Sequence, residues 1–125
     1  MFDAHFILLH VESPAASARF YADLIGQEPK ELSPTFAMFV LPSGIRLGLW
    51  SRHTVEPAAT AQGGAAEVAM MAPSAAAVDA TCAEWRGRGI AILQEPTDLD
   101  FGRTFTASDP DGHRLRVFWP FPAEG

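Results

Sequence analysis

The same hairpin pattern occurs twice in this chain, once in each half. The two segments are LPSGIRLGLW, residues 41–50, and DPDGHRLRVFW, residues 109–119. Each has a Pro-x-Gly turn followed by a run of alternating character, which is typical of a β-hairpin. Because a repeated supersecondary element indicates a repeated structural unit, this chain of 125 residues is predicted to contain two copies of one small unit.

The residues before the first hairpin predict a strand and a helix. Residues 4–11 are apolar at nearly every position, which favours a strand buried on both faces. A helix is expected to begin after Ser13 and to end at Gly26, where a left-handed cap fits. Its predicted apolar stripe consists of Ala16, Phe20 and Leu24. Strands within 36–41 and 45–50 complete a first unit of the order β, α, then two or three β.

The second half repeats this order. A strand is predicted around residues 66–71, and a helix begins at Ser74 and ends at Gly89. The apolar face of this helix is predicted to hold Val78, Cys82 and Trp85. Three further strands are expected at 91–94, 103–108 and 113–119. Residues 53–65 are rich in Ala, Gly and Pro and are interpreted as a linker between a first unit, residues 1–52, and a second unit, residues 66–121.

These patterns predict an α+β fold in one domain, residues 1–125. Two βαβββ units pair because neither can bury its sheet alone, and their curved sheets surround a concave, apolar trough with the helices outside. Such a trough is suited to a small ligand. The apolar rims and the segment Trp119-Pro120-Phe121 need covering, so a homodimer is expected.

Charge and composition exclude several classes of partner. The formal net charge of −6 argues against nucleic acid or an anionic membrane surface, since either would need a basic face. The N-terminus lacks the basic region of a signal peptide, and no apolar run is long enough to cross a bilayer, so a cytoplasmic protein is expected. Cys82 is the only cysteine, which excludes an intrachain disulfide.

The paired units, the helix segment SPAASARFYADLIGQEP and the hairpin DPDGHRLRVF together resemble the vicinal oxygen chelate superfamily. That superfamily includes glyoxalase I, extradiol dioxygenases and bleomycin-resistance proteins, and the resemblance implies the glyoxalase/bleomycin-resistance/dioxygenase fold. In the enzymes of the family, four His or Glu residues hold a divalent metal in the trough. The same scaffold also serves binders without catalysis, so the fold alone does not name the function.

The positions that correspond to these metal ligands are Phe6, Gly48, Glu67 and Arg116. One carboxylate opposite a guanidinium does not supply the three or four donors that a transition metal needs, so we predict no metal and no cofactor. Glu67 and Arg116 are expected to form an ion pair. This pair is either a structural clamp alone or a clamp whose Arg116 also meets a ligand carboxylate or quinone oxygen.

Strand alternation predicts the rest of the trough lining. Leu8 and His10 should share a face with Phe6, as Trp50 does with Gly48 and Phe118 with Arg116. Gly48 is interpreted as opening a slot against the indole, and the loop 94–102 either brings Phe101 over the trough as a lid or is a plain surface loop. The predicted ligand-binding residues are Phe6, Leu8, His10, Phe39, Gly48, Trp50, Glu67, Phe101, Arg116 and Phe118, and no catalytic residue is predicted.

The segments FILLHVESPAASARFYADLIGQEP and PSGIRLGLWSRHTVEPAA further resemble a subgroup of the superfamily that confers resistance by sequestering phenazine-type and other aromatic antibiotics. The predicted function is therefore non-catalytic, metal-free binding of a small planar aromatic compound. Two enzymatic alternatives stay open. A metal-dependent lyase or dioxygenase requires His5, His10 and Glu67 to converge, and a metal-free enzyme could use Glu67 as a base if its pKa were raised.

Overall fold

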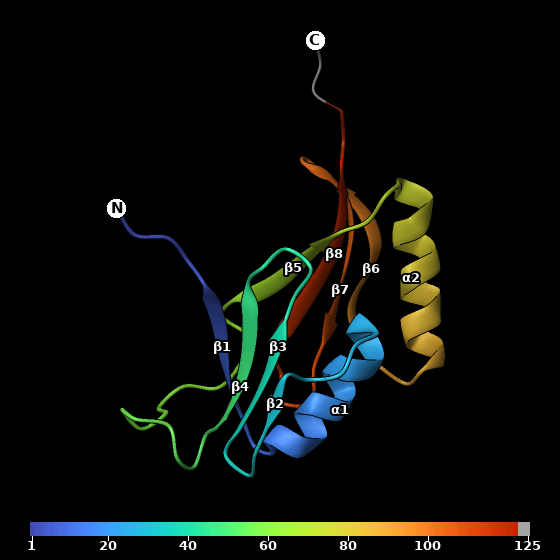
Figure 1. Cartoon of the computed structure of the whole chain (residues 1–125). Helices are drawn as coiled ribbons and strands as arrows, with labels where there is room; N and C mark the ends of the chain where they lie inside the picture. The colour runs from blue at the N-terminus through green and yellow to red at the C-terminus, as the bar shows by residue number, and fades with distance from the viewer. Residues whose placement is uncertain (123–125) are drawn as a thin grey trace. The chain divides into compact units, whose positions relative to one another are not determined.

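Each half of the chain forms a four-stranded sheet with one helix (Figure 1). This computed structural model describes residues 1–122 and divides the chain between Gly63 and Gly64 into two units. The first unit contains β1 (Phe6–Val11), α1 (Pro14–Ile25), β2 (Glu31–Leu32), β3 (Phe36–Val40) and β4 (Arg46–Ser51). The second unit contains β5 (Glu67–Met71), α2 (Ala75–Gly87), β6 (Ala91–Leu99), β7 (Gly102–Ser108) and β8 (Arg114–Pro120). The repeated βαβββ order is confirmed.

The two sheets have the same topology. Their strand orders are β1-β4-β3-β2 and β5-β8-β7-β6, with the first strand of each unit parallel to the last and the other pairs antiparallel. In the first sheet Phe6 lies opposite Arg46, and His10 lies opposite Trp50. In the second, Ala69 lies opposite Arg116. Because opposed residues point to the same side of a sheet, these registers fix which side chains share a face.

Local capping determines where the helices begin and end. The Ser13 hydroxyl accepts a hydrogen bond from the Ala16 amide at 3.2 Å, and Pro14 occupies the first turn of α1. Gly26, with φ of 77°, ends this helix in the left-handed conformation that glycine adopts without strain. The Ser74 hydroxyl caps α2 in the same way, accepting from the Ala77 amide at 3.0 Å. Within the described residues neither helix has the length and apolar character of a membrane-spanning segment.

The two helices differ in how well their buried faces were predicted. On α2 the expected stripe of Val78, Cys82 and Trp85 is buried, and the Trp85 ring meets Phe105 of β7 edge to face at 5.3 Å. On α1 the expected stripe is wrong, because the buried residues are Pro14, Ser17, Ala18 and Tyr21. Small side chains let α1 approach the sheet closely, and Tyr21 fills the contact. Tyr21 is only 1% exposed, so the helix face that carries Tyr21 is covered by the sheet, and the predicted stripe that carries Phe20 and Leu24 is not.

Each helix covers one face of its own sheet, and the core of each unit lies between that helix and that sheet. The core side chains of the first sheet are Val11, Ala37, Phe39, Leu47 and Leu49, none more than 2% exposed. The prediction that β1 is buried on both faces is wrong, since Phe6 is 43% exposed to solvent and Leu8 is 46% exposed. The face of the first sheet that α1 does not cover is called here the open face of the first sheet.

The segment after α2 is more regular than the sequence suggested. Residues 94–99 belong to β6 rather than to a loop, and only Asp100 and Phe101 separate this strand from β7. The register of β6 against β7 shifts between Ile92 and Gln94 and again between Gln94 and Thr97. Pro96 lies in the second shift, where an irregular ladder tolerates a residue without an N–H donor.

Candidate functional site

An apolar pocket of about 450 Å³ lies on the open face of the first sheet. Its walls are Phe6 and Leu8 of β1, Phe36 of β3 and Trp50 of β4. Cavities of this size are in the range that small ligands occupy in proteins. The pocket therefore has the volume and the apolar walls to hold a flat organic molecule against the sheet.

Two of the walls are aromatic rings set at right angles. The rings of Phe36 and Trp50 lie 6.4 Å apart between centroids with an interplanar angle of 88°. They come from adjacent strands, where Phe36 is the register partner of Trp50. A flat ligand that stacks on the face of one ring thus meets the edge of the other, which is the arrangement that aromatic groups prefer.

Gly48 forms the floor of this region and does not leave a slot. A Cβ atom at this position would lie 2.7 Å from Leu8 Cδ2 and 3.0 Å from two ring atoms of Phe36. Both side chains therefore close over the buried glycine backbone. The interpretation that Gly48 opens a space against the indole is replaced by one in which it lets Leu8 and Phe36 approach one another beside Trp50.

The structure places Phe39 away from the pocket. Its side chain is 0% exposed and lies on the face of β3 that packs against α1, opposite Leu47. Phe36, which the sequence reading missed, takes the position beside Trp50 instead. The signal was present in the hairpin: pairing Leu41 with Ile45 across the turn and counting outward brings Phe36, not Phe39, opposite Trp50.

Two polar side chains border the pocket within the first unit. His10 is exposed on the open face and is the register partner of Trp50 on the neighbouring strand. The Arg46 guanidinium lies over the Phe6 ring, 5.8 Å from its centroid, which is within the range of a cation–π contact. His10 and Arg46 therefore bring polar side chains close to the aromatic walls.

In the second unit Glu67 and Arg116 form the predicted ion pair. Arg116 Nε donates to Glu67 Oε1 at 2.7 Å, and Nη2 donates to Oε2 at 3.0 Å. Arg116 Nη1 also donates to Gln94 Oε1 at 3.2 Å and to Thr104 Oγ1 at 3.1 Å. Arg114 Nε lies 3.0 Å from Glu67 Oε2, but it makes no hydrogen bond in the described part of the chain. The bidentate pair and its neighbours form a clamp across β5, β6, β7 and β8.

This clamp determines the ionisation of Glu67. The hydrogen bonds from Arg116 lower the pKa of Glu67; burial opposes the shift, and the positive charges of Arg116 and Arg114 add to it. A general base acting near neutral pH would need the opposite shift, together with freedom from Arg116. The alternative in which Glu67 is the base of a metal-free enzyme is therefore not supported by its surroundings.

Lowering the pH is expected to remove the stabilising contribution of this ion pair. Because the folded protein lowers the pKa of Glu67, the contribution is complete above the ordinary value of 4.5 and is lost as the pH falls through the folded-state value. Replacing the carboxylate in Glu67→Gln is expected to reduce the free energy of unfolding by about 1–2 kcal/mol near neutral pH, and by much less at about pH 3. Urea unfolding followed by circular dichroism at both pH values measures the difference.

Glu84→Gln provides a matched control for this experiment. Glu84 pairs with Arg88 on the surface of α2, where its side chain is 57% exposed, so its loss should change the free energy of unfolding by about 0.5 kcal/mol or less. If Glu67→Gln differed from the parent protein by an equal amount at both pH values, the Glu67–Arg116 pair would not be the source of the pH dependence.

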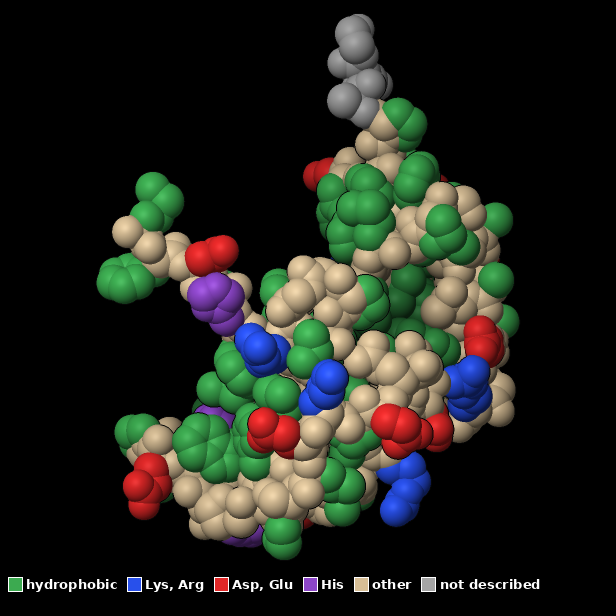
Figure 2. Space-filling view, viewed as in Figure 1, with side chains coloured by type: hydrophobic (Ala, Val, Ile, Leu, Met, Phe, Trp, Pro, Cys, Tyr) green, Lys and Arg blue, Asp and Glu red, His purple; other side chains and the backbone are tan. Residues whose placement is uncertain are grey.

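Phe101 and Phe118 meet in the second unit. Phe101 lies in the short β6–β7 turn, and its ring contacts Phe118 of β8 at 6.3 Å with an interplanar angle of 70°. The Phe121 amide donates to the Phe101 carbonyl at 2.9 Å, which ties the turn to the end of β8. Phe101 therefore lies in a two-residue turn that is hydrogen-bonded to the end of β8, and not in a long loop. Phe101 is 46% exposed. Hydrophobic side chains that reach the surface on the side viewed are green in Figure 2.

The residues at the family's metal positions do not fit a metal ion. Of Phe6, Gly48, Glu67 and Arg116, only Glu67 has a donor atom that metals favour, and Arg116 occupies both of its oxygens. Among residues 1–122 no group of three or more His, Cys, Asp or Glu side chains is placed to hold an ion. The metal-dependent alternative would need a ligand set drawn from His5 and His10 of the first unit and Glu67 of the second.

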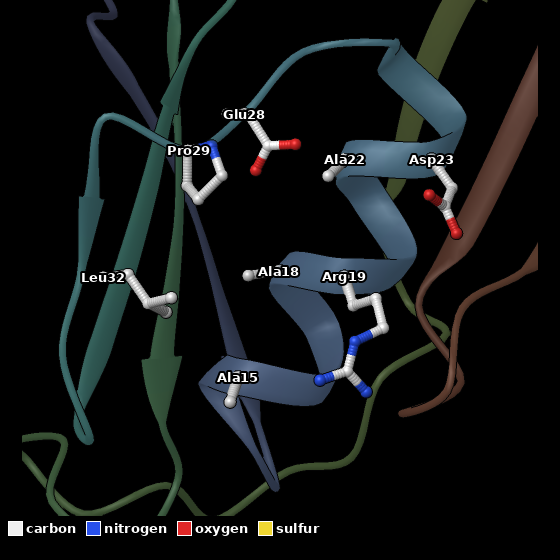
Figure 3. Close-up of a pocket in the computed structure, with 8 residues that line it drawn as sticks. All are labelled: Ala15, Ala18, Arg19, Ala22, Asp23, Glu28, Pro29 and Leu32. Atoms are coloured by element: carbon white, nitrogen blue, oxygen red, sulfur yellow. The ribbon is translucent and has the colours of Figure 1, made fainter.

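A second, smaller groove of about 240 Å³ lies beside α1 (Figure 3). Its walls are Ala15, Ala18, Arg19, Ala22, Asp23, Glu28, Pro29 and Leu32. Ala18 and Ala22 face Leu32 and Pro29, whereas Arg19 and Asp23 extend from another side of the helix. None of the residues predicted to bind a ligand lines this groove, and its mixed polar and apolar walls distinguish it from the aromatic pocket.

Comparison with known proteins identifies the family. A sequence profile described as the Glyoxalase/Bleomycin resistance protein/Dioxygenase superfamily matches residues 4–117. The chain belongs to this superfamily. The resemblance noted from the helix segment and the D-P-D-G hairpin is confirmed, and so is the fold of two βαβββ units that this superfamily implies.

Individual members of the superfamily are similar to this chain over most of its length. The phenazine antibiotic resistance protein EhpR of Enterobacter agglomerans is 33% identical over 113 residues, covering 88% of this chain and 86% of EhpR. A protein from Agrobacterium tumefaciens solved by NMR is 51% identical, with a TM-score of 0.90 and coverage of 98% and 100%. A glyoxalase/bleomycin resistance protein/dioxygenase from Nocardioides is 25% identical, with a TM-score of 0.82 and coverage of 99% and 87%.

Proposed function

We propose that this chain binds a small planar aromatic compound of the phenazine class, sequesters it unchanged and so confers resistance to an antibiotic of that class. The observation that carries the proposal is the pocket whose walls are Phe6, Leu8, Phe36 and Trp50. The similarity to EhpR, a phenazine antibiotic resistance protein, supports the choice of ligand class.

The walls of the pocket favour a flat ring over a flexible chain. An aromatic ligand gains from burial of its faces and, in addition, about 0.5–1.5 kcal/mol from each well-placed aromatic contact. The perpendicular rings of Phe36 and Trp50 offer one face and one edge to the same ligand. A rigid ring also loses little conformational entropy on binding, which adds to its advantage over an aliphatic chain of equal area.

The chemistry of the surrounding groups supports binding without transformation. The Glu67 carboxylate is held by Arg116 with a lowered pKa, which suits a structural ion and not a proton acceptor. The Cys82 thiol is 1% exposed, and burial raises its pKa, so it is poorly suited to act as a nucleophile. The donor set at the family's metal positions likewise does not favour metal-assisted chemistry.

Calorimetric titration tests the proposed function. Unsubstituted phenazine and phenazine-1-carboxylate are expected to bind with one site per chain, and an aliphatic carboxylate of similar mass is expected to bind at least about tenfold more weakly. Chromatography after prolonged incubation should recover each phenazine unchanged, both with chelator-treated protein and with protein supplied with Zn²⁺, Mn²⁺ or Fe²⁺. Equal affinity for aromatic and aliphatic compounds would refute the binding proposal, and time-dependent conversion of the phenazine would refute sequestration.

A further inference from the structure

Arg46 is the cation that borders the aromatic pocket within the first unit. It begins β4 and lies two residues before Gly48 and four before Trp50, so strand alternation places all three on the open face. Its guanidinium lies over the ring of Phe6, which is itself a wall of the pocket. The residue is exposed, and among the residues that the structure describes its guanidinium makes no ion pair and no hydrogen bond.

The contact with Phe6 positions this guanidinium without using its hydrogen-bonding capacity. A cation–π contact needs no hydrogen-bond acceptor, so the N–H groups of Arg46 remain available to a ligand. A planar guanidinium that rests on a ring can still bind a carboxylate through two parallel N–H donors. Phe6 thus reduces the rotamer freedom of a side chain that would otherwise lose more entropy on binding.

Arg116, the residue that the sequence suggested for this task, is already engaged. Its guanidinium donates to both oxygens of Glu67, to Gln94 and to Thr104, and its side chain is only 16% exposed. A ligand carboxylate at Arg116 would have to compete with Glu67 for the same donors. Arg46 has no such competitor, and its charge is not balanced by a paired carboxylate in the described part of the chain.

We propose that Arg46 recognises an anionic substituent of the aromatic ligand, so that the pocket selects aromatic carboxylates over neutral rings of the same shape. This inference rests on the proposed function and deepens it by assigning the ligand a negative charge and the protein a specificity-determining residue. The ring of the ligand packs against Trp50 and Phe36, and its carboxylate reaches the Phe6 end of the pocket, where the Arg46 guanidinium donates hydrogen bonds to it in an ion pair.

Calorimetry with phenazine-1-carboxylate and unsubstituted phenazine tests this assignment. Arg46→Gln is expected to weaken binding of the carboxylate by about five- to tenfold, and binding of the neutral ring by less than about twofold. Arg46→Lys keeps the charge but cannot form the bidentate hydrogen bonds of a guanidinium. The affinity of this variant for the carboxylate should therefore lie between those of the parent and Arg46→Gln. Raising the salt concentration should weaken carboxylate binding by the parent more than by Arg46→Gln.

Arg19→Gln is the matched control, since it removes the same charge from an exposed position of the same unit, on α1 and away from the open face. It should leave both affinities within about twofold of the parent, and circular dichroism should show all variants folded. If the parent binds both phenazines and Arg46→Gln weakens both equally or neither, this inference is wrong while the proposed function stands. If the parent binds neither phenazine, the proposed function and the inference that rests on it both fall.

Discussion

Phe39→Ala is expected to reduce the free energy of unfolding by about 3–5 kcal/mol, a large fraction of the stability of a chain of this size. The Phe39 ring is 0% exposed in the core between the first sheet and α1, and its register partner Leu47 is 2% exposed. Truncation therefore removes a fully buried ring and leaves a cavity that the packed neighbours fill only in part. Urea unfolding followed by circular dichroism measures the loss, and Phe39→Leu, at about 1–1.5 kcal/mol, provides a milder variant that should remain folded.

Comparing Phe36→Ala with Phe39→Ala distinguishes a residue of the pocket wall from a residue of the core. Phe36 lies three residues earlier on the same strand but on the open face, partly exposed beside Trp50. Its truncation is expected to lower stability by only about 1 kcal/mol while weakening binding of phenazines, because the ring contributes mainly to the pocket wall. A Phe36→Ala protein that is destabilised more than Phe39→Ala would contradict the assignment of these two rings to opposite faces of β3.

Trp50→Ala is expected to weaken binding of phenazines by at least about tenfold. The indole is a wall of the pocket and the partner of Phe36, so its removal takes away both a stacking surface and apolar area that a ligand would bury. Tenfold corresponds to about 1.4 kcal/mol, which the loss of one stacking contact and its buried area supplies. Isothermal calorimetry is the suitable measurement because it does not depend on the fluorescence of the residue being removed.

Trp119 offers a control for the loss of a tryptophan. It lies in the second unit on β8, on the opposite face of that strand from Phe118, and takes no part in the aromatic pocket. Trp119→Phe should keep the affinity of the parent within about twofold, and Trp50→Phe should bind with intermediate affinity because a smaller ring still stacks. If folded Trp50→Ala bound phenazines as tightly as the parent protein, the aromatic pocket would not be the ligand site.

Much of the fold follows from short-range patterns in the sequence. The Pro-x-Gly turns specify the two hairpins, Ser13 and Ser74 cap the two helices, and Gly26 ends the first of them, because each depends only on the conformational preferences of a few adjacent residues. The Glu67–Arg116 pair was predicted differently, from the positions that correspond to the metal ligands of the superfamily, and the structure confirms the contact between β5 and β8.

The parts of the fold and of the site that the sequence did not reveal depend on contacts between helices and strands. Periodicity shows that a helix has faces, but the close approach that small side chains allow determined that Tyr21, and not Leu24, packs on the sheet. Alternation likewise shows that Phe36 and Phe39 lie on opposite faces, but the hairpin register and the position of α1 decided which ring is core and which is pocket. The closure of Leu8 and Phe36 over Gly48 and the placement of Arg46 on Phe6 join strands far apart in sequence. Local pattern determines the spacing of side chains, whereas only packing determines which of them meet.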